Sequence, residues 1–292
     1  SYLIDDEMVA LVDTVDICYF EVYLRKIKQV IGERPINYLI INHMEPDHSG
    51  SIRLIKQHYP EIIIVGNKQT FGMIEGFYGV TGEQYLVKEG DFLALGHHKL
   101  RFYMTPMVHW PETMMTFDET DGVLFSGDGF GCFGTVDGGF LDTRINVDKY
   151  WGEMVRYYSN IVGKYGSPVQ KALQKLGGLP ISAICSTHGP VWTENIAKVI
   201  GIYDRLSRYD ADEGVVIAYG SMYGNTEQMA EAIAEELSAQ GVKNIVMHNV
   251  TKSHPSYIIA DIFRYKGLII GSPTYSNQIF PEVESLLSKI LV

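Results

Sequence analysis

The sequence of 292 residues predicts an α/β protein with two domains. Over roughly the first 200 residues, short apolar runs of strand length alternate with amphipathic stretches of helix length. The segment 207–214 is charged and nearly free of aliphatic side chains, as is typical of a linker. After it, apolar strands and helices alternate with short connections, which is typical of a parallel sheet. We therefore expect a first domain at residues 1–206, a linker at 207–213 and a second domain at 214–292.

The pattern of apolar residues places the individual elements. In the first domain we expect strands at residues 2–4, 9–12, 38–41, 62–65, 84–87, 100–104, 114–117 and 123–125. Helices are expected at residues 19–31, 52–58, 68–77, 148–159, 167–176 and 193–209. The second domain should contain strands at 214–219, 244–250 and 267–270, and helices at 227–240 and 257–264.

Composition excludes several classes of protein. The net charge is -11 and no basic run is present, which argues against nucleic acid as a partner. No apolar run approaches the ~20 residues that a membrane-spanning helix needs, and no signal peptide is visible, so we expect no membrane partner. The cysteines are sparse and form no C-x-x-C pair, which argues against a disulfide framework and indicates a reducing compartment, so we expect a cytoplasmic protein. We expect Cys18 and Cys185 to pack as small hydrophobic residues and Cys132 to be structural.

The stretch H-M-E-P-D-H at residues 43–48 carries the strongest chemical signal. It follows an apolar strand, where a scaffold presents functional loops. In an extended loop, His43, Glu45 and Asp47 would face one way and His48 the other, with Pro46 stiffening the chain. Four ligand-type side chains so close together suit two metal ions better than one. The alternative is a solvated polar loop before a helix.

Three further ligand-type residues favour the metal site over that alternative. His109, Asp128 and His188 each follow an apolar run of strand length, and each precedes a turn signal of Gly or Pro. We therefore predict one metal site with seven protein ligands, which are His43, Glu45, Asp47, His48, His109, Asp128 and His188.

Two loops of the second domain predict a phosphate-containing cofactor. The first joins a buried strand to a helix start, where backbone N–H groups and the helix dipole attract an anion. It consists of Ser221, Met222, Tyr223, Gly224, Asn225 and Thr226. It lacks the lysine of an ATP-binding loop, so it fits a monophosphate. The alternative is an ordinary helix capped by Thr226. The second loop follows the third strand and offers Pro273, Thr274, Tyr275 and Asn277 to a flat ring or its side chain.

The order H-x-E-x-D-H, then His, Asp and His, resembles the flavodiiron proteins, also called A-type flavoproteins. The resemblance implies a metallo-β-lactamase-like αββα sandwich followed by a flavodoxin-like domain. It implies that His43, Glu45, His109 and Asp128 bind one iron and that Asp47, His48, Asp128 and His188 bind the other. Glu45 stands where related zinc hydrolases usually have a histidine. Sites rich in carboxylates favour iron or manganese over zinc.

The phosphate loop resembles the FMN-binding loop of flavodoxins, except that Tyr223 stands where a Ser or Thr is usual. Because a flavodoxin domain has two further strands, we expect the chain to be a part of a longer protein, truncated at both ends. We expect Trp110, Tyr157 and Tyr158 to pack in the core, with a place in the lining of the metal pocket as the alternative. We expect His58, His97, His98, His248 and His254 to lie on the surface.

The resemblance implies an oxidoreductase that reduces O2 to water, NO to N2O, or both. FMN would reload the two irons with electrons from rubredoxin or from a reduced flavin or deazaflavin. It also implies a head-to-tail homodimer, or a dimer of dimers. One alternative is a dizinc metallo-β-lactamase-like hydrolase fused to a flavodoxin-like module. Another is a non-catalytic module for electron transfer or gas sensing.

Overall fold

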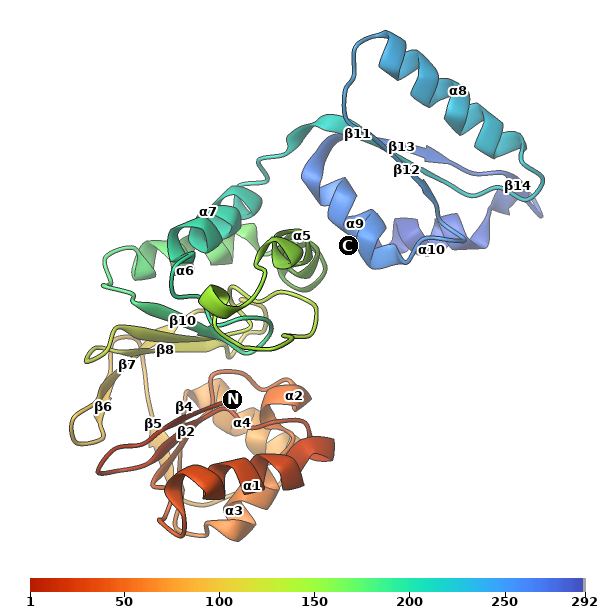
Figure 1. The fold of residues 1–292 in the computed structure, drawn as a ribbon. Coiled ribbons are helices and arrows are strands. Elements are labelled where there is room, and N and C mark those ends of the chain that lie inside the picture. The colour runs from red at the N-terminus through yellow and green to blue at the C-terminus, as the bar shows by residue number, and fades with distance from the viewer. Residues whose placement is uncertain (291–292) are drawn as a thin grey trace.

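The first domain is a sandwich of two sheets with helices on both outer faces (Figure 1), in a computed structural model that describes residues 1–290. Both sheets have five strands, in the orders β1-β2-β3-β4-β5 and β10-β9-β8-β7-β6. The first sheet consists of β1 (Tyr2–Ile4), β2 (Ala10–Val12), β3 (Tyr38–Ile40), β4 (Ile63–Gly66) and β5 (Gln84–Leu86). The second consists of β6 (Phe92–Ala94), β7 (Lys99–Met104), β8 (Met114–Asp118), β9 (Val123–Gly127) and β10 (Ala183–Ser186). This αββα arrangement confirms the predicted fold class.

The outer helices cover the sheets because each carries an apolar stripe. In α1, for example, Phe20, Leu24, Ile27 and Ile31 recur at helical spacing and are buried. The helices outside the first sheet are α1 (Phe20–Ile31), α3 (Ile52–His58) and α4 (Lys68–Tyr78). Those outside the second are α5 (Asp148–Tyr157), α6 (Gly166–Leu176) and α7 (Ile196–Ser207). Single turns are η1 (Ile17–Tyr19), α2 (Pro46–Ser49), η2 (Asp142–Arg144) and the π-helical turn η3 (Tyr158–Val162).

Apolar side chains fill the space between the two sheets, with Ile40 and Val65 facing Phe102 and Phe125 in one buried cluster. At its edge, Asn42 ties the sheets together. Its Nδ2 donates to the Phe125 carbonyl (3.1 Å), and its Oδ1 accepts from Thr116 (2.8 Å). Since Asn42 immediately precedes His43, this link fixes the start of the ligand-rich loop against the opposite sheet.

The second domain is a three-stranded parallel sheet in the order β12-β11-β13. The strands are β11 (Asp212–Tyr219), β12 (Ile245–Asn249) and β13 (Tyr265–Gly271). On one face lies α8 (Asn225–Ala239), and on the other lie α9 (Pro255–Arg264) and α10 (Pro281–Ile290) (Figure 1). A hairpin of β14 (Thr274–Tyr275) and β15 (Gln278–Ile279) follows β13. The first strand in the sequence is central, so the strand order reverses beside it, which is where such sheets bind ligands.

Several elements differ from the sequence prediction. The sequence did not indicate β6, the hairpin β14–β15 or α10; β6 and the hairpin strands are too short for periodicity to reveal. Helix α7 begins at Ile196 instead of residue 193, because Asp142 holds the preceding residues in a loop. Of the cysteines, Cys132 and Cys185 are buried, but Cys18 is exposed, so its prediction as a packed residue was wrong. No helix within residues 1–290 has the length and apolarity to cross a membrane.

The buried carboxylate of Asp142 organises the entry to α7. Its Oδ1 accepts from the Thr193 backbone and hydroxyl (3.0 and 2.6 Å). Its Oδ2 accepts from the Glu194 backbone and from the Asn195 backbone and amide (3.1, 2.9 and 3.0 Å). Burial alone would raise the pKa of Asp142, but these donors outweigh it and lower the pKa.

We predict that Asp142→Asn lowers the free energy of unfolding at neutral pH by roughly 2–3 kcal/mol, because buried donors lose a charged acceptor. A carboxyl with a lowered folded pKa stabilises the protein above its unfolded pKa of about 3.9, and this stabilisation is lost as the pH falls through the folded value. The difference from wild type should therefore shrink in acid. Urea unfolding at several pH values measures it, with the exposed Asp137→Asn as control; a pH-independent difference would contradict the assignment.

Candidate metal centre

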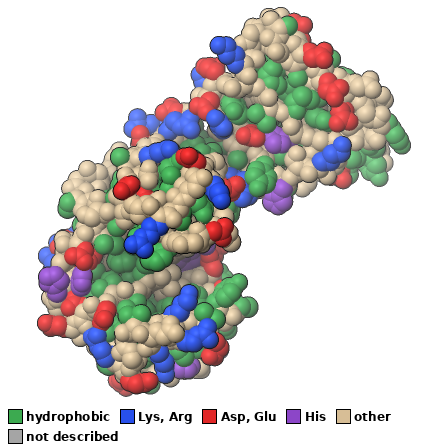
Figure 2. Space-filling view, viewed as in Figure 1, with side chains coloured by type: hydrophobic (Ala, Val, Ile, Leu, Met, Phe, Trp, Pro, Cys, Tyr) green, Lys and Arg blue, Asp and Glu red, His purple; other side chains and the backbone are tan. Residues whose placement is uncertain are grey.

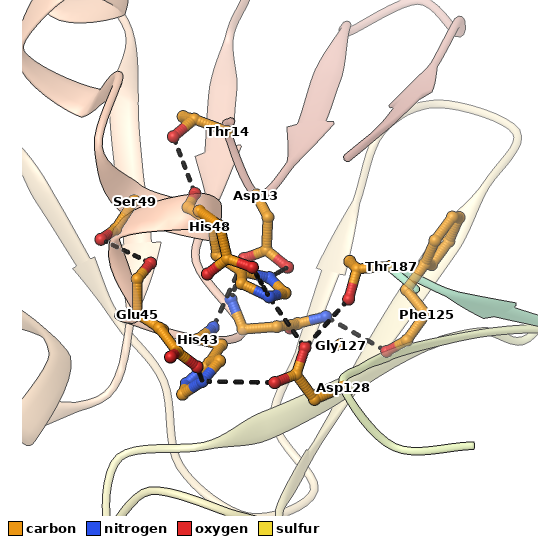
Figure 3. A network of polar contacts seen from close by, with 12 residues as sticks. Asp13, Thr14, His43, Glu45, His48, Ser49, Phe125, Gly127, Asp128 and Thr187 are labelled. Atoms are coloured by element: carbon orange, nitrogen blue, oxygen red, sulfur yellow. Dashed lines mark hydrogen bonds and ion pairs between the residues drawn. The ribbon is translucent and has the colours of Figure 1, made fainter. Parts of the chain in front are cut away.

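All seven predicted ligand side chains meet at one edge of the sandwich, where strands of both sheets end. They fall into two groups, and the ligand atoms of each group lie within 4.8 Å of one another. The first group comprises His43, Glu45, His109 and Asp128; the second comprises Asp47, His48 and His188. His43 follows β3, whereas Asp128 and His188 follow β9 and β10. Carboxyl ends of strands from the two sheets therefore build a single site (Figure 3).

The Asp128 carboxylate lies between the two groups and faces each with a different oxygen. Its Oδ2 lies 3.1 Å from His109 Nε2 and 3.7 Å from His43 Nε2. Its Oδ1 lies 2.8 Å from His48 Nε2 and 3.2 Å from His188 Nε2. Glu45 completes the first group at 3.1 Å from His109, and Asp47 the second at 3.2 Å from His188. A carboxylate placed in this way can serve two cations at once.

The ligand-rich loop is not extended as predicted. Pro46 begins the short helix α2, with Glu45 at its N-cap, so Asp47 and His48 lie on a helical turn. Proline favours this position because its fixed φ suits a first turn and its missing N–H needs no partner there. Ser49 closes the turn by donating to the carbonyls of Met44 and Glu45 (2.7 and 3.0 Å). The helical turn brings Asp47 and His48 to one side, where alternation predicted opposite faces.

Three residues that the sequence patterns did not indicate hold these side chains in place, and two of them, Asp13 and Glu112, are buried. Glu112 Oε1 lies 2.9 Å from His43 Nδ1 and accepts from the Met44 backbone (2.8 Å). Asp13 accepts from the Asn42 backbone (2.8 Å) and lies 3.5 Å from His48 Nδ1. Thr187 donates to Asp128 Oδ1 (3.1 Å). Carboxylates on the far nitrogens of His43 and His48 leave both Nε2 atoms free for a metal, as is common around metal sites.

Charges in the site are closely paired. Burial alone would lower the pKa of the histidines, but the carboxylates outweigh it. Asp128 and Asp13 raise the pKa of His48 to about 10, and Asp128 and Asp47 raise that of His188 to about 9. Hydrogen bonds with His109 and His43 lower the pKa of Glu45 to about 2. A metal ion that binds these histidines would have to displace their protons.

The donor set fits cations on a second ground. Among the described residues, the buried atom Asp47 Oδ1 at the site has no hydrogen-bond partner. Unpartnered buried polar atoms are unfavourable and uncommon in folded proteins. An unpartnered oxygen beside a cluster of histidines and carboxylates is placed to donate to a metal ion.

The aromatic residues near the site divide into two kinds. Tyr158 packs in the core of the second sheet, as predicted. Tyr157 is also buried, but its ring lies 5.6 Å from that of His188, and Trp110 packs edge-on against His43 at 5.2 Å. These two rings therefore pack directly against ligand side chains. Among the other histidines, His98 is half-buried beside Asp118 (2.8 Å) and His248 beside Asp261 (2.8 Å), so the surface prediction was wrong for both.

The two predicted cofactor loops are neighbours at the carboxyl edge of the second sheet. Gly224, with a left-handed φ of 87°, is the N-cap of α8, and its N–H donates to Ser221 Oγ (3.1 Å). Thr226 lies inside the helix and is not its cap. A Cβ on Gly271, at the end of β13, would lie 3.2 Å from the Thr226 methyl, so the loops are in close contact. Tyr223 and Tyr275 project beside them, 88% and 49% exposed.

Comparison with known proteins agrees with this two-domain structure. A model of the ODP family beta lactamase matches residues 1–189, and a flavodoxin model matches residues 217–291. The chain is 32% identical to the anaerobic nitric oxide reductase flavorubredoxin of Vibrio vulnificus and 31% identical to that of Escherichia coli, covering 99% of its own length in both cases. It spans 60% and 61% of the length of these relatives.

Solved structures with the same fold include an oxidoreductase and a flavodiiron protein. The rubredoxin oxygen:oxidoreductase of Desulfovibrio gigas superposes with a TM-score of 0.95 at 31% identity, over 99% of this chain and 73% of that one. The flavodiiron protein of Giardia intestinalis also gives 0.95, at 27% identity, over 99% and 71% of the two chains. The chain belongs to the flavodiiron proteins, with an ODP-family β-lactamase-like domain followed by a flavodoxin domain.

Proposed function

We propose that this chain is the diiron and flavin part of an oxidoreductase that reduces O2 to water, NO to N2O, or both. The observation that supports this most strongly is Asp128, which presents one carboxylate oxygen to each ligand group. His43, Glu45 and His109 would hold one iron with Asp128, and Asp47, His48 and His188 the other. When bound, the two irons would supply the electrons for the reduction.

The protein's own residues would prepare the site for that chemistry. Glu112 and Asp13 orient the imidazoles of His43 and His48. The apolar core between the sheets closes the inner side of the site, and Tyr157 and Trp110 pack around the ligands. Excluding water in this way limits side reactions at a reduced centre. Three carboxylates among the ligands favour iron over zinc. Zinc is the metal that the dizinc hydrolase alternative requires.

We propose FMN as the cofactor of the second domain. The Ser221–Gly224 contact shapes a loop at the helix N-terminus without a fixed cation, which suits a monophosphate. Thr274 and Asn277 lie in the neighbouring hairpin, where they can hydrogen-bond the ribityl chain or ring edge. Tyr275 stands beside them and can cover the flat ring.

Electron transfer then requires a second subunit. Figure 1 places β14 and the start of α8 at the end of the second domain that points away from the sandwich. We propose a head-to-tail homodimer in which the flavin domain of one subunit faces the metal centre of the other. A cavity of about 600 Å³ beside α2 offers an apolar surface to the flavin domain of the partner subunit. It is lined by Ile17, Pro46, Phe77, Tyr78 and Trp110. Hydrophobic side chains protrude there near the start of α1 (Figure 2). Rubredoxin or a reduced flavin or deazaflavin is the proposed external donor.

The direct test is iron and zinc analysis of purified protein, followed by anaerobic reduction and mixing with O2 and with NO. The proposal predicts two irons per chain, a yellow flavin spectrum and consumption of at least one of the gases. Zinc in place of iron would favour the hydrolase alternative. Loaded iron and flavin without turnover would favour an electron-transfer or sensing module.

Replacing the shared ligand should affect both metals. We predict that Asp128→Asn loses most of the bound iron and lowers gas consumption by more than about 100-fold, since both groups lose a ligand. Asp118→Asn is the matched control, because Asp118 is equally buried and also pairs with a histidine, at the His98 site. An Asp128→Asn protein that retains both irons would refute the shared role.

Glu112 should affect the metal site through its contact with His43. Glu112→Gln should weaken iron binding roughly 10–100-fold, as measured by competition with a chelator, because the imidazole loses its charged partner. The control is Glu119→Gln, which removes a half-buried ion pair with Lys99 and Arg101 away from the site. Equal iron affinity in Glu112→Gln and wild type would show that the charge of Glu112 does not contribute to iron binding.

The cofactor loop can be tested with a pair of glycines. Gly224 and Gly241 both have positive φ, 87° and 91°, and open space where the methyl group of an alanine would lie. Gly224→Ala should raise the Kd for FMN up to about tenfold, because the free loop can relax out of a conformation that binding must restore. Gly241→Ala carries similar backbone strain at the far end of α8 and should leave the Kd unchanged. Equal effects of the two changes would place the FMN phosphate elsewhere.

A further inference from the structure

The two domains of the chain meet where α5 and η3 of the first contact α9 of the second (Figure 1). Asn160 donates to the Ser256 carbonyl (3.0 Å), and Tyr158 packs on Phe263 with ring centroids 5.7 Å apart. Interfaces between domains of one chain usually allow relative motion unless specific contacts hold them. The contacts made by Arg156 are the most specific ones here.

Arg156, near the end of α5, lies between two aromatic rings from different domains. Its guanidinium carbon is 4.4 Å from the ring centre of Phe133 in the first domain and 4.4 Å from that of Tyr257 in α9. Its Nη1 donates to Ser256 Oγ (2.9 Å), and its Nε and Nη2 donate to Glu153 (2.8 and 2.5 Å). A planar guanidinium can stack on two faces and donate in its plane at the same time, which a lysine cannot do.

The contacts continue from Phe133 to the metal centre. Its ring packs against Tyr157 at 5.0 Å, and Tyr157 packs against the ligand His188 at 5.6 Å. Tyr157 has little room to move, because a Cβ on Gly131 would already lie 3.1 Å from its ring. Gly131 itself donates to the carbonyl of Asp128 (3.1 Å). A displacement of Phe133 is therefore passed to the residues that carry two ligands, because close-packed interiors transmit strain.

We propose that Arg156 is a positioning residue that links the docking of the flavodoxin domain to the placement of His188. The second domain holds Arg156 through Tyr257 and Ser256, and Arg156 holds Phe133 against Tyr157. The metal centre is then fully ordered only when the flavodoxin domain of the same chain is docked. This inference rests on the proposed metal site for its consequence, but not for the contacts that carry it.

Three variants of the full chain separate the two ends of this linkage. Arg156→Gln removes the contact with both domains. Phe133→Leu cuts the connection to Tyr157 but keeps the contacts of Arg156 with Tyr257 and Ser256. Arg205→Gln is the matched control, because Arg205 pairs with Asp212 at the same junction (2.8 Å) and does not contact this series of rings.

Three measurements apply to each variant. Trypsin cleavage at the exposed Arg208 of the linker reports domain docking. Hydrogen exchange in the segment 184–192 reports the order of the backbone that carries His188. The rate at which bound Co²⁺ is lost to a chelator reports the metal site itself.

Arg156→Gln should speed linker cleavage, raise exchange in segment 184–192 and speed Co²⁺ loss about tenfold. Phe133→Leu should change exchange and Co²⁺ loss in the same way while leaving linker cleavage at the wild-type rate. Arg205→Gln should leave exchange and Co²⁺ loss unchanged. Far-ultraviolet circular dichroism confirms that each variant is folded.

The proposal is overturned if Arg156→Gln loosens the linker without changing the His188 segment, or if Phe133→Leu behaves as wild type. It is equally overturned if Arg205→Gln matches Arg156→Gln, since any weakening of the junction would then suffice. Failure of wild type to hold Co²⁺ would count against the metal site instead, and the exchange and cleavage data would still decide the role of Arg156.

Discussion

The site depends on a single buried carboxylate held between two sets of histidines. Asp128 faces His109 with one oxygen and His48 and His188 with the other, deep at the edge of a sandwich. Burying so many ionisable groups is unfavourable unless they are paired or bound to cations. In the metal-free protein the charges pair with one another, whereas two metal ions would satisfy all seven ligands together. The flanking contacts of Asp13, Glu112 and Thr187 fix these ligands before any metal arrives.

The sequence was sufficient to predict which seven side chains gather at one site, because the segments that carry them follow apolar strands and strand ends of a sandwich share an edge. It was insufficient for the local geometry. Alternation predicted opposite faces for Asp47 and His48, but Pro46 starts a helical turn there. Asp13 and Glu112 were not indicated because each is a single carboxylate far in sequence from the histidine that it contacts, and only the fold brings them to His48 and His43. Tyr157 was assigned to the core because only the fold brings its ring against His188.

In the second domain, too, the sequence predicted the order of elements but not the local geometry. Strand and helix order predicted a doubly wound sheet, and the observed order β12-β11-β13 confirms it. The loop after β13 contains a two-residue hairpin with positive φ at Ser276 and Asn277, which single-sequence patterns did not reveal. That hairpin presents Thr274 and Tyr275 beside the helix N-terminus at Gly224. The proposed flavin site is thus a meeting of two loops, neither of which is specific alone.

Both domains together indicate that the placement of the cofactors depends on how the domains dock. The flavin loops point away from the metal centre of their own chain, so a partner subunit would complete the electron path. Arg156 would hold each metal domain against the flavodoxin domain of its own chain. The identity and number of the metals beside Asp128 decide whether this site is a diiron centre. Anomalous diffraction from crystals of the purified protein at the iron and zinc edges measures this directly. We expect two iron peaks about 3.5–4 Å apart that flank the Asp128 carboxylate. A single peak, or peaks that appear only at the zinc edge, would contradict it.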